Sequence, residues 1–128
     1  MKTEVFKRLL IEELYLKKWI RNGSWTWNED ETIDVKGSVQ VMMYKGSKLP
    51  VKFNYVSDYF SCSFNTLTSL EGCPSFVGRY FNCQNNLLSS IEFAPKSVAT
   101  NFYCQMNLVK FSKDEITKIC HVGGSINP

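Results

Sequence analysis

The stretch from Leu49 to Asn107 contains three gapless copies of one pattern. They read LPVKFNYVSDYFSCSFN (Leu49–Asn65), LEGCPSFVGRYFNCQNN (Leu70–Asn86) and IEFAPKSVATNFYCQMN (Ile91–Asn107), and each begins 21 residues after the last. A fixed period of this size is typical of solenoids, in which each repeat buries its apolar face only by stacking on its neighbours. The sequence therefore predicts that these copies stack as coils.

Equivalent positions of the copies form columns of chemically matched residues. The columns are Val56, Val77 and Val98; Phe60, Phe81 and Phe102; Cys62, Cys83 and Cys104; Asn65, Asn86 and Asn107; and Leu67, Leu88 and Val109. A weaker copy one period earlier places Val35, Val39, Val41, Tyr44 and Leu49 in the Val, Phe, Cys, Asn and closing-Leu columns. We therefore expect about three and a half coils over residues 35–111.

Each coil is expected to contain one short strand. The alternation at Phe60 and Cys62 predicts a strand of three or four residues, which is too short to be stable alone. Stacked copies can pair as parallel strands about 4.8 Å apart. At the Asn column the chain turns out of the strand, and a side-chain amide there can bond backbone groups that the turn leaves unpaired.

The run of Phe60, Cys62, Asn65, Leu67 and Leu70 resembles the leucine-rich-repeat pattern L-x-L-x-x-N-x-L-x-x-L, with Phe and Cys replacing two leucines. In addition, LTSLEGCP (residues 67–74) is similar to a segment that recurs in small leucine-rich-repeat-like proteins of tailed bacteriophages and bacteria. This resemblance implies a leucine-rich-repeat-like solenoid. It also implies a phage-encoded inhibitor of a bacterial host enzyme or defence system, acting in the host cytoplasm.

A solenoid exposes its first and last coils, and both ends of this one have a candidate cap. Residues 3–21 have the periodicity of an amphipathic helix, which we expect to cover the first coil. Its main apolar face comprises Val5, Phe6, Leu9, Leu10, Leu16, Trp19 and Ile20. Trp25 and Trp27, followed by a turn at residues 28–31, are expected to fasten this helix to the solenoid.

At the other end, Ser112 to Glu115 reads as a capping box before a short helix over residues 116–120. Residues 112–122 are therefore expected to form a C-terminal cap. The predicted fold is α+β, with a single domain over residues 1–128: an N-terminal capping helix, a solenoid of short parallel strands and a short C-terminal helix.

Composition argues against several classes of protein. The 15 Lys and Arg nearly balance the 12 Asp and Glu, and Lys17, Lys18 and Arg21 are the main basic cluster, so we expect no nucleic-acid partner. We expect no membrane association, because no apolar run approaches the roughly 18 residues of a membrane-spanning helix. Glu12 and Glu13 interrupt the N-terminal apolar stretch, which argues against a signal peptide. Five cysteines without an export signal indicate reduced thiols in a cytoplasm.

Catalytic, cofactor-binding and metal-binding residues are not expected. The column of Cys62, Cys83 and Cys104 lacks the local spacing of a zinc site and fits core packing, whereas Cys73 is expected nearer the surface. The alternative of a Cys-dependent enzyme pairs His121 with Cys104 or Cys120 as base and nucleophile, but no third group is placed to orient the imidazole. A nucleic-acid-binding accessory protein is a further alternative.

The favoured function is a non-catalytic protein–protein interaction module that binds through the outward-pointing columns of the repeat. These columns carry no formal charge and include aromatic and methionine side chains, which are enriched at protein interfaces. The candidate partner-binding residues are Met42, Met43, Phe64, Gln84, Asn85, Tyr103, Gln105 and Met106. Alternatively some of them, Phe64 especially, lie beneath a neighbouring loop.

A second candidate surface lies on the N-terminal helix, where Ile11, Leu14 and Tyr15 are opposite the main apolar face. If the helix simply covers the solenoid, these three residues are exposed to a partner protein or to a second copy of the chain in a homo-oligomer. Alternatively, Trp25 and Trp27 fold over them and bury them.

Overall fold

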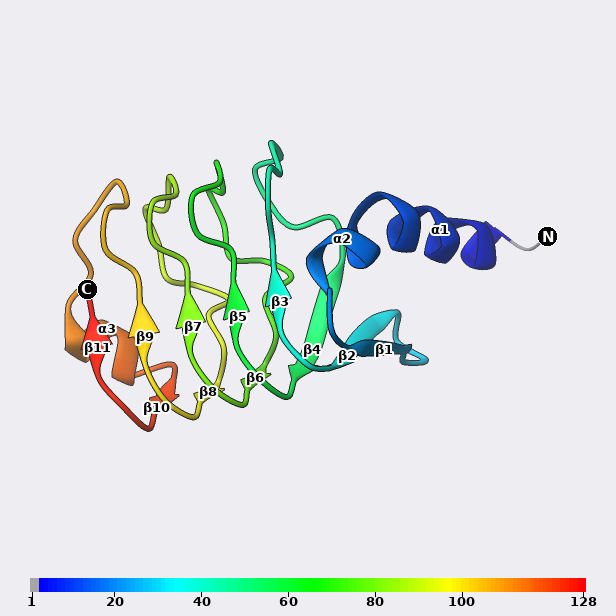
Figure 1. Cartoon of the computed structure of the whole chain (residues 1–128). Coiled ribbons are helices and arrows are strands. Elements are labelled where there is room, and N and C mark those ends of the chain that lie inside the picture. The colour runs from blue at the N-terminus through cyan, green and yellow to red at the C-terminus, as the bar shows by residue number, and fades with distance from the viewer. Residues whose placement is uncertain (1–2) are drawn as a thin grey trace.

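The computed structural model describes residues 3–128 and shows an N-terminal helix followed by a β-solenoid of about five stacked coils (Figure 1). Two sheets run along the solenoid, in the strand orders β1-β2-β4-β6-β8-β10 and β11-β9-β7-β5-β3. The strands are β1 (Ser24–Trp27), β2 (Thr32–Lys36), β3 (Val39–Gln40), β4 (Lys52–Val56), β5 (Phe60–Ser61), β6 (Phe76–Val77), β7 (Phe81–Asn82), β8 (Ser97–Val98), β9 (Phe102–Tyr103), β10 (His121–Val122) and β11 (Ile126–Asn127).

The parallel registers confirm the 21-residue repeat. In the second sheet Phe60 pairs with Phe81, and Phe81 with Phe102. Their buried rings form a ladder with centroid separations of 5.9 and 5.1 Å. The Val column forms a matching buried ladder in the first sheet, so the core lies between the two sheets and extends through every coil.

The number of coils and of strands per coil differs from the prediction. Each coil contributes a strand to both sheets, whereas the repeat predicted one strand. A further coil lies where the sequence predicted only a cap, because Val122 pairs with Val98 and Ile126 with Phe102. These pairs are 24 residues apart instead of 21, since the loop before β10 contains the helix α3 (Lys113–Thr117). The altered spacing hides this coil from a search for a fixed period.

The N-terminal helix continues through α1 (Thr3–Ile11), the π-helical turn η1 (Glu12–Leu16) and α2 (Lys17–Trp19). Leu16, Trp19 and Ile20 are buried in the core, which confirms part of the predicted lid. However, the expectation for the N-terminal half was wrong, since its apolar side chains remain 43–54% exposed: Val5, Phe6, Leu9 and Leu10. Figure 1 shows the reason, because α1 extends beyond the first coil and only the end of the helix reaches it.

The two tryptophans fasten the helix as predicted. The indole Nε1 groups of Trp25 and Trp27 both donate to Oε2 of Glu12, at 2.8 and 2.9 Å. Arg8 adds an ion pair to Glu31 at 2.7 Å and lies over the Trp27 ring. The hairpin of β1 and β2 thus connects the helix to the first sheet.

The predicted capping box is present at α3, where the side chains and backbone N–H groups of Ser112 and Glu115 bond reciprocally. The helix begins at Lys113, before the predicted residues 116–120.

The expectation that Cys73 lies nearer the surface was wrong, because all five cysteines are buried. Among residues 3–128, no helix is long and apolar enough to cross a membrane.

Candidate functional site

Four coils share an unusual backbone conformation at the corner that follows the second-sheet strand. Met43, Phe64, Asn85 and Met106 have φ values of 55°, 58°, 56° and 60°, in the left-handed region. That region costs an L-residue roughly 1–2 kcal/mol, and Asn tolerates it better than Met or Phe. Because the conformation recurs at the same position, the corner is a built-in part of the repeat.

The Asn column holds these corners, as the sequence predicted. The Nδ2 group of Asn86 donates to the carbonyl oxygens of Cys62 and Cys83 at 2.9 and 3.2 Å. Its Oδ1 accepts the backbone N–H of Leu67 at 3.0 Å. Asn107 makes the equivalent bonds one coil later. Each asparagine therefore ties its own corner to the preceding coil.

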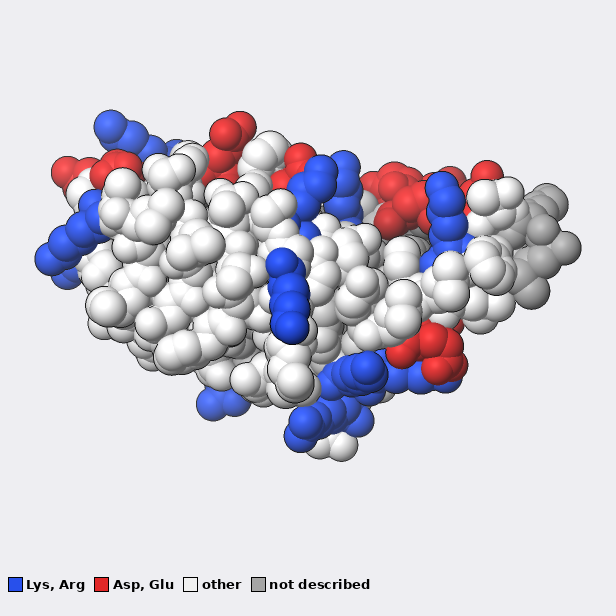
Figure 2. All heavy atoms as spheres, turned by 90° about the horizontal axis from the view of Figure 1, so that it is seen from above, with Lys and Arg blue, Asp and Glu red and all other residues white. Residues whose placement is uncertain are grey.

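The left-handed corners present large apolar side chains to solvent. Met43 is 94% exposed, and Phe64 and Met106 are each 71% exposed. Leu87 and Leu108, two residues beyond the corner position in their coils, are also exposed. We call this set of Met43, Phe64, Leu87, Met106 and Leu108 the apolar corner row. Figure 2 looks down on the side of the molecule where the strands of the second sheet end, and the surface over the coils is largely uncharged there.

The predicted partner-binding residues divide into two groups. Met43, Phe64 and Met106 are exposed, so the alternative that Phe64 lies beneath a loop was wrong. The other five are only partly exposed: Met42, Gln84, Asn85, Tyr103 and Gln105. Sequence reasoning missed Leu87 and Leu108, because their column contains Lys45 and Thr66 in the first two coils and shows no pattern.

The second predicted surface is not a continuous one. Leu14 is exposed, but Ile11 and Tyr15 pack against the core. The Tyr15 ring contacts the rings of Trp19 and Tyr44, with centroids 5.0 and 5.8 Å away. The exposed apolar residues of the helix are instead Leu14 and four residues of α1.

The thiols lie in surroundings unlike those of a catalytic cysteine. Burial raises the pKa of Cys104 and of Cys120 to about 11, whereas a nucleophilic thiol needs a lowered pKa. His121 is exposed on β10, next to Cys120 in the chain. Within residues 3–128, no three His, Cys, Asp or Glu side chains are grouped to hold a metal ion.

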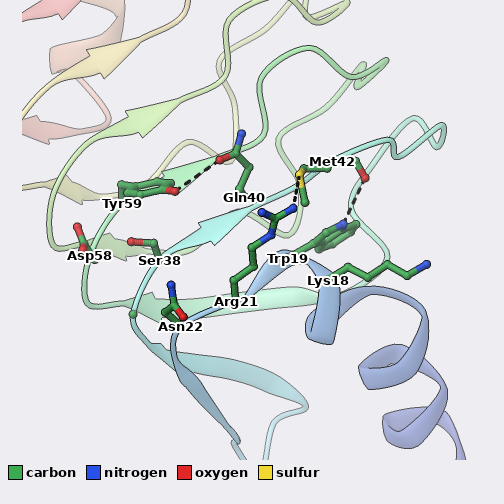
Figure 3. Close-up of a pocket in the computed structure, with 10 residues that line it drawn as sticks. Lys18, Trp19, Arg21, Asn22, Ser38, Gln40, Met42, Asp58 and Tyr59 are labelled. Carbon is green, nitrogen blue, oxygen red and sulfur yellow. Dashed lines mark hydrogen bonds between the residues drawn. The ribbon is translucent and has the colours of Figure 1, made fainter.

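A cleft that the sequence did not predict lies between the end of the N-terminal helix and the first two coils (Figure 3). Its volume is about 550 Å³, and its walls include Arg21, Ser38, Gln40 and Tyr59. These residues come from three separate segments of the chain, so no local motif could have indicated the cleft.

Comparison with known proteins found no match to this chain among protein-family models, curated proteins or solved structures.

Proposed function

We propose that this chain is a non-catalytic module that binds another protein through the apolar corner row. The proposal rests on the type of residue found at the left-handed corners. Three of the four hold Met or Phe, although Asn85 shows that an asparagine fits the same conformation. Large exposed apolar side chains at strained positions cost stability and solubility, and such strain clusters at functional sites.

The chemistry of the corner row suits a protein partner. Met and aromatic side chains are enriched at interface centres, where charged residues are depleted. Methionine is flexible and polarizable, so Met43 and Met106 can adapt to an apolar surface around the more rigid Phe64. With adjacent coils about 4.8 Å apart, the row is roughly 15 Å long, which matches a compact cluster of energetically dominant contacts.

The identity of the partner is proposed from the sequence resemblance alone. Similarity to small leucine-rich-repeat-like phage proteins supports a bacterial host enzyme or defence component, bound and inhibited in the host cytoplasm. In this proposal inhibition follows from covering a surface of the target, because the chain contributes no chemistry of its own.

The test compares the wild-type chain with a triple variant carrying Met43→Asn, Phe64→Asn and Met106→Asn. Asparagine is suited to the left-handed conformation, so the variant should fold and gain roughly 0.5–1 kcal/mol of stability per site. In affinity capture from a bacterial lysate, we expect a specific protein to be retained by the wild type and lost by the variant.

Phe93 offers a matched control. It is 51% exposed and also has a positive φ of 68°, but it lies in the connection from β7 to β8, six residues beyond Leu87, and is not part of the corner row. Phe93→Asn should leave capture unchanged. If the triple variant is folded and captures the same proteins as the wild type, the corner row is not the binding site.

A further inference from the structure

A stack of tyrosine rings on the second sheet ends at the cleft. Tyr59 and Tyr80 are one coil apart and nearly parallel, with centroids 4.7 Å apart and an interplanar angle of 3°. In the first coil the same column holds Ser38, whose neighbour Val39 pairs with Phe60. The side chain of Ser38 is too short to continue the stack. Within residues 3–128, therefore, no ring stacks on the face of Tyr59 that points toward the first coil.

The cleft opens at this vacant stacking position. Its lining includes Gly37 and Ser38, both small, together with Tyr59. Figure 3 shows Ser38 between Tyr59 on one side and Asn22 and Arg21 on the other. The volume of about 550 Å³ is within the range of roughly 300–1,000 Å³ that is typical of small-molecule sites.

Two cations line the opposite end of the cleft. Within residues 3–128, neither Lys18 nor Arg21 has a carboxylate within ion-pair distance. The Nη2 group of Arg21 contacts only the Sδ atom of Met42, at 3.9 Å, which is a weak interaction. The planar guanidinium is thus able to bind the oxygens of a phosphate, whereas Figure 3 shows the Lys18 ammonium pointing away from it.

Polar groups around the Tyr59 ring can bond the edge of a heterocycle. The amides of Asn22 and Gln40 offer both donors and acceptors. The Asp58 side chain also lines the cleft and is 42% exposed, although its Oδ1 is buried 3.6 Å from Nη1 of Arg79. The exposed part of this carboxylate can accept an N–H from the base.

We propose that this cleft binds a nucleoside monophosphate. The base occupies the vacant position above Ser38 and stacks on Tyr59, continuing the tyrosine ladder by one ring. Its polar edge meets Asp58 and the two amides, and its phosphate is bound by Arg21. The cleft is a small-molecule site in addition to the proposed protein-binding surface, and it does not depend on the apolar corner row.

Isothermal titration calorimetry of the full chain with AMP tests the proposal. Adenosine lacks the phosphate and ribose 5-phosphate lacks the base, so each should bind at least about ten-fold more weakly than AMP. Phenyl phosphate presents the ring and phosphate that a phosphotyrosine would supply. It should also bind more weakly, because it has no heterocycle edge for Asp58 and the amides.

Two variants locate the ligand. Ser38→Tyr places a ring where the base is expected, as Tyr59 and Tyr80 do in the next coils, and should weaken AMP binding by about ten-fold or more. Arg21→Gln, at an exposed position that should not affect folding, should reduce AMP binding to the level of adenosine. Lys110→Gln removes an exposed cation elsewhere and should change nothing.

Several results would overturn the proposal. These are absence of heat with millimolar AMP, wild-type affinity in the Arg21→Gln variant, or wild-type affinity in a folded Ser38→Tyr variant. Equal binding of AMP and ribose 5-phosphate would show that the stacking position is not used. Tighter binding of phenyl phosphate than of AMP would assign the cleft to a phosphorylated tyrosine and reject the nucleotide.

Discussion

Single residues in this solenoid act on two coils at once, and the Asn column shows this best. Asn86 is 5% exposed, and its amide bonds backbone groups on its own coil and on the coil before it. The neighbouring Asn85 is partly exposed and takes the left-handed conformation. Of these two adjacent asparagines, Asn86 makes hydrogen bonds between coils and Asn85 adopts the left-handed backbone conformation of the corner.

Replacing Asn86 with alanine should destabilise the whole chain. The change leaves the buried N–H of Leu67 without an acceptor, and the carbonyl groups of Cys62 and Cys83 keep only the bonds from Asn65 and Asn107. We expect a loss of about 2–4 kcal/mol in the free energy of unfolding, measured by urea denaturation. Asn54→Ala is the control, because the exposed amide of Asn54 donates only to Asp34, and it should cost less than about 1 kcal/mol. Equal losses would contradict the assigned role of the column.

The repeat made the buried columns predictable but not the conformation of the corners. Val, Phe, Cys and Asn recur at a fixed period, so their stacking into ladders can be predicted without knowing the backbone conformation. A left-handed residue is usually recognised because it is Gly or Asn. Of the four corners only Asn85 gives that signal, so Met43, Phe64 and Met106 were predicted as exposed strand-face residues instead.

At the scale of elements, periodicity indicated the N-terminal helix but not its position on the solenoid. An amphipathic pattern shows that one face is apolar, yet it does not show how much of that face reaches the core. Here the first coil contacts only the end of the helix, and α1 keeps its apolar side chains exposed. The contact is fixed by Glu12, a charged residue that the hydrophobic pattern does not single out.

Glu12→Ala should loosen the helix from the solenoid. The substitution removes the shared acceptor of the Trp25 and Trp27 indole groups, and hydrogen bonds to a charged group are worth about 1.5–3 kcal/mol each. We expect a loss of about 2–3 kcal/mol in urea denaturation and faster amide hydrogen exchange over residues 3–19.

The neighbouring glutamate provides the control for this experiment. Glu13 is exposed and pairs only with Lys17, so Glu13→Ala should cost no more than about 0.5 kcal/mol. Glu12→Gln keeps one acceptor oxygen and should recover part of the stability. If Glu12→Ala and Glu13→Ala behave alike, the indole bonds do not hold the helix.

Across the whole molecule, cysteines of successive coils pack in one continuous apolar core. Cys62, Cys83 and Cys104 are buried at equivalent positions, as predicted from their period. Cys73 is buried too, although Lys52 and Ala94 in the same column are not. The prediction that Cys73 is exposed was wrong because β4 begins at Lys52 whereas β6 begins only at Phe76. Equivalent positions of the repeat therefore have different local conformations.

Because these thiols are buried, the stability of the whole fold should depend on alkaline pH. Burial raises the pKa of Cys73 and Cys83 well above the usual value of 9.0, and that of Cys104 and Cys120 to about 11. Below pH 9 the thiols are protonated in both the folded and the unfolded chain. Above pH 9 the unfolded chain ionises first, and it therefore becomes favoured as the pH rises toward 11.

The expected result is a fall in the free energy of unfolding between pH 8 and pH 10.5, of about 1–2 kcal/mol for each of Cys104 and Cys120, to which Cys73 and Cys83 add. Urea denaturation at the two pH values measures it in the wild type and in Cys104→Ala. Other groups, including Tyr44 and Tyr80, whose pKa burial also raises, contribute equally to both proteins and cancel in the comparison. The variant should therefore lose about 1–2 kcal/mol less than the wild type over this range. The same fall in both proteins would mean that the Cys104 thiol ionises as readily in the folded coil as in the unfolded chain.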